Sequence, residues 1–154
     1  MERYQHTLWN YLEVNNFGLR ERLNIAIRLT KQVKIAHDGW VAHRDLKPTN
    51  IMVDAENELV LVDFGIGHNV GDLKGSCGTP GFNAPEQFFG VDQHSVVDIF
   101  SLGKNLVLIL FEWKIGWILL WSSEEWIKSK KLDHQLALLS DLFKFIRRMM
   151  QVNL

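Results

Sequence analysis

The sequence has a single cysteine, Cys77, among its 154 residues. One cysteine cannot form an intramolecular disulfide or supply a cysteine-rich metal site, so we expect an intracellular, cytoplasmic protein. An excess of one charge is also lacking, because 17 Lys and Arg stand against 18 Asp and Glu. A net charge of −1 argues against a nucleic-acid surface and a polybasic membrane surface, which both depend on neutralising phosphate groups. Residues 1–6 are polar and no apolar stretch follows, which argues against a secretory signal.

Long hydrophobic runs are missing as well, although 47% of the residues are hydrophobic. The most apolar stretch begins at Leu106, but Glu112, Lys114 and Gly116 interrupt it before the roughly 18 to 20 residues that a membrane span requires. A buried central helix within residues 99–121 is favoured over a membrane span.

The first 62 residues predict two helices and a hairpin. Apolar residues recur at steps of four and three from Leu19 to His37, which is typical of an amphipathic helix, and a shorter helix is predicted to start at Thr7. The apolar runs 51–53 and 59–62 flank polar residues and read as a hairpin. With a further helix predicted over 136–150, the expected fold is a single, mainly α domain with a small sheet (α+β).

Three polar clusters stand out against this apolar background. The first, HRDLKPTN over residues 43–50, follows the long helix and precedes the hairpin. The second, DFG over residues 63–65, ends the hairpin. The third, GTPGFNAPE over residues 78–86, lies in a Gly-rich stretch from 65 to 90 that shows no periodicity. A loop of that length inside a domain is usually functional or disordered.

The chemistry of the first two clusters favours a magnesium site. Asp45, Asn50 and Asp63 carry hard oxygen ligands and flank a hairpin that can bring its ends together. Mg²⁺ binds few protein oxygens and leaves its other positions to water and phosphates. Lys47 adds a cation beside the same site. This set suits phosphoryl transfer, in which a protein supplies positioning and charge stabilisation.

The order HRDLKPTN, DFG and APE resembles the catalytic loop, the metal-binding turn and the end of the activation segment of eukaryotic protein kinases. Asp45 and Asp63 are 63 − 45 = 18 residues apart, which fits that family. The resemblance implies a partial kinase domain over residues 1–154, with a catalytic loop at 43–50 and an activation segment at 63–86. The implied fold is the hinge and C-terminal lobe, with a small β-hairpin near the catalytic loop and without the N-terminal lobe.

The resemblance implies catalytic roles for five residues. Asp45 would orient the substrate hydroxyl and accept its proton, and Lys47 would stabilise the transferred phosphoryl group. Thr79 would contact both of these side chains. Lys47 and Thr79 are features of the Ser/Thr-directed branch. Asn50 and Asp63 would hold two Mg²⁺ ions.

Nucleotide-binding roles follow in the same way. Residues 1–4 resemble the hinge between the two lobes, which places Glu2 and Tyr4 near the adenine edge of ATP. Met52 takes the place of the aliphatic floor of the adenine pocket, and Asp63 reaches the phosphates through the metal. The implied cofactors are therefore ATP and Mg²⁺.

Regulatory or structural roles are implied for seven further residues, which are His43, Arg44, Phe64, Gly65, Ser76, Glu86 and Asp98. Arg44 would pair with a phosphorylated residue of the activation segment, for which Ser76 is the nearest candidate. Phe64 would pack so as to set the active arrangement. Asp98, at the start of the central helix, would tie down the backbone of the catalytic loop.

Two family features are not found in the 154 residues. Upstream of His43 there is neither a Gly-rich loop over the phosphates nor the strand lysine of the V-A-I-K type. The Arg that usually pairs with Glu86 is also missing, although Arg147 or Arg148 could replace it. We therefore expect weak or no transfer by the isolated chain, and association through an uncovered inter-lobe face.

Three functions remain open at this stage. The first is Mg-ATP-dependent phosphorylation of serine or threonine in a protein substrate, with the N-terminal lobe or another kinase as a partner. The second is an inactive binding module that engages kinases or their substrates by mimicry. The third is an interaction protein that uses the helix bearing Trp113, Trp117 and Trp121. The complete set of metal ligands favours the first, because a mimic has no need of them.

Overall fold

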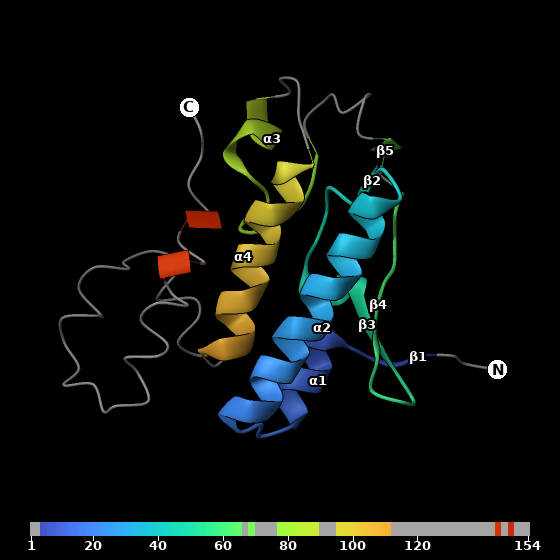
Figure 1. Cartoon of the computed structure of the whole chain (residues 1–154), viewed down its shortest axis with the longest axis vertical. Coiled ribbons are helices and arrows are strands. Elements are labelled where there is room, and N and C mark those ends of the chain that lie inside the picture. The colour runs from blue at the N-terminus through green and yellow to red at the C-terminus, as the bar shows by residue number, and fades with distance from the viewer. Residues whose placement is uncertain are drawn as a thin grey trace.

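The computed structural model describes residues 4–65, 68–69, 77–89, 95–111, 144–145 and 148–149. In these residues the elements follow in the order β1 (Tyr4–Thr7), α1 (Leu8–Val14), α2 (Leu19–Asp38), β2 (Val41–Ala42), the 3₁₀ turn η1 (Pro48–Asn50), β3 (Ile51–Asp54), β4 (Leu59–Leu61), β5 (His68–Asn69), α3 (Pro85–Phe89) and α4 (Val96–Leu110). Figure 1 labels the helices and strands. Most of the helix predicted at 136–150, and the tryptophans at 113, 117 and 121, lie outside the described residues.

The predicted long helix is confirmed as α2, which runs one residue further than expected. Its buried side chains include Ile25, Leu29 and Val33, which repeat at steps of four and form one apolar stripe. The sequence Asp38-Gly39 is typical of a helix end, and α2 does end before Gly39. Gly39 has a φ of −81°, however, and the left-handed conformation belongs to Trp40 with a φ of 59°.

Helix α1 begins where the sequence predicts. The Thr7 hydroxyl accepts a hydrogen bond from the backbone N–H of Asn10 at 3.2 Å, which caps the helix N-terminus. Leu8 of this helix is fully buried in the core.

The predicted hairpin is confirmed as β3 and β4, which pair antiparallel with Ile51 opposite Leu61. A third strand, which the sequence did not predict, joins on the other side, because β1 pairs antiparallel with β3 and gives the order β1-β3-β4. Strand β1 has exposed residues at its centre and no apolar alternation, so it carries no local strand signal. The short strands β2 and β5 form a separate antiparallel pair, with Ala42 opposite His68.

Helices α2 and α4 lie side by side and hold most of the core (Figure 1). The fully or nearly fully buried apolar side chains come from both helices, from the sheet and from the loop before η1, and include Leu29, Leu46, Ile51, Val53, Leu59, Val107 and Ile109. Arg22 crosses this interface, since its Nη1 donates to the carbonyl of Ile109 at 2.9 Å. The start of α2 is thereby tied to the end of α4.

The central helix predicted at 99–121 is present in part as α4, which begins three residues earlier, at Val96, and ends at Leu110. Residues 112–121 of the predicted range lie outside the described residues. Three buried polar side chains, Asp98, Ser101 and Asn105, interrupt the apolar surface of α4 at steps of three and four. They therefore share one face of the helix. Among the described residues, no helix combines the length and apolar character that crossing a membrane requires.

Candidate active site

The segment from His43 to Lys47 has no helix or strand of its own, and contacts from α4 hold its backbone. The buried carboxylate of Asp98 accepts a hydrogen bond from the N–H of His43 at 2.7 Å and one from the N–H of Arg44 at 2.8 Å. Its Oδ2 also lies 2.9 Å from Nε2 of His37. The side chain of Asp98 thus ties α2, α4 and this segment together, which is the contact that the resemblance implies.

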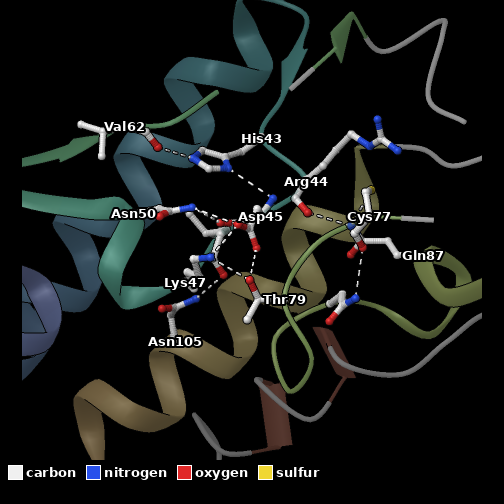
Figure 2. Close-up of polar contacts among 12 residues, drawn as sticks. His43, Arg44, Asp45, Lys47, Asn50, Val62, Cys77, Thr79, Gln87 and Asn105 are labelled. Carbon is white, nitrogen blue, oxygen red and sulfur yellow. Dashed lines mark hydrogen bonds and ion pairs between the residues drawn. The ribbon is translucent and has the colours of Figure 1, made fainter. Parts of the chain in front are cut away.

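Three side chains meet at the carboxylate of Asp45 (Figure 2). The Thr79 hydroxyl donates to Oδ1 of Asp45 at 2.6 Å, and Nζ of Lys47 lies 2.8 Å from Oδ2. Lys47 also donates to the hydroxyl oxygen of Thr79 at 2.8 Å. The structure therefore brings together a carboxylate, an ammonium group and a hydroxyl that are up to 34 residues apart in sequence.

Asn50 adds a further bond to the same group. Its Nδ2 donates to the backbone carbonyl of Asp45 at 3.0 Å and to Oδ2 of Asp45 at 3.1 Å. Burial raises the pKa of Asp45, but the hydrogen bonds from Lys47, Thr79 and Asn50 and the charge of Lys47 together outweigh it. The pKa of Asp45 therefore lies below its ordinary value, and the carboxylate is ionised at neutral pH.

His43 links this site to the predicted metal-binding turn. Its Nε2 lies 2.9 Å from the carbonyl oxygen of Val62, and its ring packs on Phe64 with 4.6 Å between ring centroids. The N–H of Val62 in turn donates to the carbonyl of Asn50 at 3.0 Å. Asp63 therefore lies between two residues that contact the catalytic-loop segment.

Asp63 is exposed and has a φ of 62°, in the left-handed region that non-glycine residues rarely adopt. Its side chain has no hydrogen bond or ion pair within the part of the chain that the structure describes. Since the amide nitrogen of Asn50 is committed to Asp45, the oxygen of that amide is the group left for a cation. One carboxylate and one amide oxygen suit Mg²⁺, which takes few protein ligands. The described ranges contain no group of three or more His, Cys, Asp or Glu that could hold a metal.

The residues 78–87 pack against the other side of the catalytic-loop segment. Gly78 has a φ of 91°, and a Cβ at this position would lie 3.0 Å from the carbonyl oxygen of Arg44, so only glycine fits without strain. Gln87 is fully buried, and its Nε2 donates to the same carbonyl at 2.8 Å. Its Oε1 accepts from the N–H of Ala84 at 2.9 Å.

Sequence reasoning missed Gln87, and it also missed Asn105 of α4. The Nδ2 of Asn105 donates to the carbonyl of Leu46 at 3.0 Å, between Asp45 and Lys47 in the chain. Its signal was present in the sequence, because an amide directly precedes the apolar run from Leu106 to Leu110. Burying an amide on the core-facing side of a helix costs free energy unless the amide is hydrogen-bonded, so a buried asparagine indicates a hydrogen-bond partner.

Tyr4 and Met52 of the predicted nucleotide pocket lie on neighbouring strands. Tyr4 pairs with Asp54, which is two residues from Met52 in β3, so the three side chains share one face of the sheet. Ile51 and Val53 are buried on the opposite face.

Among the remaining predicted residues, the Arg44 side chain is buried, and Gly65 is exposed in a turn. Glu86 is half-buried, and its Oε2 is inaccessible to solvent with no hydrogen-bond partner among the described residues. Glu2, Ser76 and Arg147 lie outside the described residues, whereas Arg148 is described and exposed.

Comparison with known proteins identifies a family. The family model described as protein kinase domain matches residues 1–153. The SNF1-related protein kinase catalytic subunit alpha KIN12 of Arabidopsis thaliana is 40% identical over 81 residues, which cover 51% of this chain and 16% of that protein. The serine/threonine-protein kinase chk-2 of Caenorhabditis elegans is 41% identical over 102 residues, which cover 61% of this chain and 21% of that protein. A probable myosin light chain kinase of Dictyostelium discoideum is 32% identical over 108 residues, 66% of this chain and 31% of the relative. The matched region therefore spans less than a third of the length of each of these three relatives.

Proposed function

Because the chain belongs to the protein kinase family, we propose that it carries a site that transfers the γ-phosphoryl group of Mg-ATP to a serine or threonine hydroxyl of a protein. The observation that carries this proposal is the Asp45 carboxylate, which Thr79 and Lys47 contact at 2.6 and 2.8 Å. A carboxylate fixed by a hydroxyl and an ammonium group has a defined direction, which general-base catalysis and substrate orientation require.

Asp45 is proposed to orient the attacking hydroxyl and to accept its proton. The hydroxyl oxygen forms a bond to the γ-phosphorus as the bond from this phosphorus to the β,γ-bridging oxygen breaks, and ADP leaves. The lowered pKa of Asp45 keeps the carboxylate ionised and able to accept a hydrogen bond from the substrate. Most of the acceleration is expected from positioning, since the transition state is loose and needs little proton abstraction.

Lys47 is proposed to stabilise the charge on the transferred phosphoryl group. Its ammonium group carries three N–H donors, of which two are directed at Asp45 and Thr79. The third remains for a phosphoryl oxygen. The Thr79 hydroxyl contacts both Lys47 and Asp45. The ammonium donor and the carboxylate acceptor therefore lie next to each other, where both can face the transferred phosphoryl group.

Asn50 and Asp63 are proposed to hold Mg²⁺ through the amide oxygen and the carboxylate. The metal supplies charge neutralisation on the phosphates when it is bound. The carboxylate of Asp63 supports this assignment, because it is exposed and has no protein partner among the described residues, which leaves its oxygens accessible to a cation.

The adenine is proposed to lie on the sheet face that bears Tyr4 and Met52, with Glu2 of the hinge at its edge. In this arrangement the chain corresponds to the hinge and C-terminal lobe of a kinase. These 154 residues contain no Gly-rich loop upstream of His43 and no strand lysine. The nucleotide is then held from one side only, so we propose that these residues alone transfer phosphate slowly.

A transfer assay tests the proposal. The 154-residue chain is given Mg-ATP and a generic basic protein, alone and with a separately folded segment that carries a Gly-rich loop and a strand lysine. We expect slow transfer that the added segment accelerates, and a loss of at least about 100-fold in Asp45→Asn. The matched control is Asp38→Asn, whose exposed carboxylate pairs with Lys34 at the end of α2.

Two results would contradict the proposal. If the Asp45→Asn variant transferred phosphate at the full rate, Asp45 would not be the base. A chain that binds kinases or their substrates but transfers no phosphate under either condition would instead support the binding module.

A further inference from the structure

Three successive carbonyl groups of the catalytic-loop segment each accept a hydrogen bond from a side-chain amide (Figure 2). The carbonyl of Arg44 accepts from Gln87 at 2.8 Å, that of Asp45 from Asn50 at 3.0 Å, and that of Leu46 from Asn105 at 3.0 Å. The three amides come from α3, η1 and α4. The first and third of these carbonyls, those of Arg44 and Leu46, belong to the residues directly before and after Asp45 in the chain.

These bonds replace a regular hydrogen-bond ladder. The segment is neither helix nor strand, so its peptide groups have no neighbours in a ladder to fix their planes. The peptide plane that contains the Arg44 carbonyl also contains the nitrogen of Asp45, and the plane with the Leu46 carbonyl contains the nitrogen of Lys47. A donor on each carbonyl therefore fixes the backbone that enters Asp45 and the backbone that enters Lys47.

The burial of Asn105 shows that its amide is costly for stability. The side chain is fully buried in α4, and its Oδ1 has no hydrogen-bond partner among the described residues. A leucine of similar shape would bury no polar atom there and would leave no acceptor unsatisfied. The Nδ2 of Asn105 also donates to the carbonyl of Ser101 within α4 at 2.7 Å. The bond to Leu46 at 3.0 Å is the one that reaches outside the helix, so it is the contact through which this amide can act on the catalytic-loop segment.

Gln87 supports the same conclusion from the opposite side. It is fully buried, and its two amide atoms join Ala84 to Arg44, which has a φ of 68°. Because that left-handed conformation is unfavourable for arginine, contacts of its neighbours must hold it. The bond from Gln87 is one of these contacts.

We propose that Gln87 and Asn105 are positioning residues, which hold the two peptide groups that aim the side chains of Asp45 and Lys47 at Thr79. This inference rests on the proposed function for its catalytic consequence, but its geometric content stands apart from it. In this proposal neither residue contacts substrate or nucleotide. Each acts through the backbone of the residue that it holds.

Residue-resolved amide hydrogen exchange of the folded chain tests the geometry without any assay of transfer. Asp45 and Asn50 have amides bonded within the segment, to Nδ1 of His43 and to the carbonyl of Lys47. In Asn105→Leu we expect exchange at both amides to accelerate roughly tenfold, while the amides of Leu29 and Val33 in α2 keep their rates. Gln87→Met gives a second variant with the same expectation at Asp45, in case the first one folds poorly.

A matched control separates positioning from general loosening of α4. Leu106→Val shortens the next side chain of α4 in the core, and we expect uniform, small acceleration in α2 and α4. Unchanged exchange at Asp45 and Asn50 in Asn105→Leu, or acceleration spread evenly over α2, would overturn the proposal.

The transfer assay adds a second measurement. Misaimed side chains reduce kcat and leave the KM for ATP unchanged, so we expect Asn105→Leu to lose roughly tenfold or more in kcat alone. Unchanged kcat would overturn the catalytic consequence. A chain that transfers no phosphate counts against the proposed function, and the exchange experiment still decides the positioning role.

Discussion

The hydroxyl of Thr79 lies 2.6 Å from Oδ1 of Asp45, although 34 residues of sequence separate the two. Neither residue belongs to a helix or a strand. Their contact therefore depends on side chains that reach in from other elements, among them Asp98 and Asn105 of α4 and Gln87 of α3.

Removal of the Thr79 hydroxyl should raise the pKa of Asp45. The hydroxyl donates to the ionised carboxylate and so favours its charged form. We expect a higher Asp45 pKa in Thr79→Ala and a nearly unchanged pKa in Thr79→Ser, which keeps the donor. A ¹³C NMR titration of the Asp45 carboxyl measures both, and equal pKa values in the two variants would contradict the assignment.

Asp45 should also contribute to the pH dependence of stability. Its pKa is lower in the folded chain than the ordinary value of about 3.9 in the unfolded one. The contribution is therefore fully present above that ordinary value and is lost as the pH falls through the folded pKa. Urea unfolding between pH 7 and pH 3 should show a shallower acid loss in Asp45→Asn than in the parent chain. The exposed Glu56→Gln variant controls for the loss of one carboxylate, and a parent-like slope in Asp45→Asn would refute the expectation.

Replacement of Asp98 by asparagine should lower the free energy of unfolding by about 2 to 4 kcal/mol. The two carboxylate oxygens of Asp98 contact the backbone N–H groups of His43 and Arg44 and the ring of His37, whereas an asparagine keeps only one acceptor oxygen. Urea unfolding at pH 7 measures the change. The same substitution at the exposed Asp38 should cost less than about 1 kcal/mol, and similar losses at the two positions would argue against the anchoring role.

Trp40 should tolerate replacement by residues that accept a left-handed backbone. Its φ is 59° and its side chain is 73% exposed, so the strained conformation is not offset by deep burial. We expect Trp40→Asn to keep or raise the free energy of unfolding by up to about 1 kcal/mol, and Trp40→Val to lower it by a similar amount. Thermal unfolding compares the two, and the opposite order would show that packing of the indole dominates.

Features encoded within a few residues were predictable from the sequence. The Thr7 cap, the apolar stripe of α2 and the hairpin of β3 and β4 each depend on near neighbours, and each is confirmed. Strand β1 was missed because its partner β3 lies almost 50 residues away and supplies the hydrogen bonds that make it a strand. The left-handed residue after α2 is Trp40, where the chain turns into β2, and nothing in the local sequence marks a tryptophan for that conformation.

In the candidate site, too, some residues were predictable from the sequence and others were not. The motifs placed Asp45, Lys47, Asn50 and Thr79 in one group because a known family carries them in that order. In the structure their side chains are within hydrogen-bond distance of one another. Gln87 and Asn105 had no motif to mark them. A single amide in an apolar helix becomes informative only when the carbonyl that it meets is known, and Leu46 is 59 residues from Asn105. The chemical roles of all these residues stay predictions until the experiments above are done.

The two anchors on α4 also have a consequence for the order of folding. Asp98 and Asn105 are seven residues apart, or about 10 Å along the helix, and hold His43, Arg44 and Leu46 from one helix face. During synthesis, a chain that has emerged only as far as Asn50 lacks both anchors. The segment around Asp45 can then take its shape only after α4 has emerged and docked on α2. The site is therefore expected to be among the last parts of this fold to form, and among the first to be lost when α4 detaches.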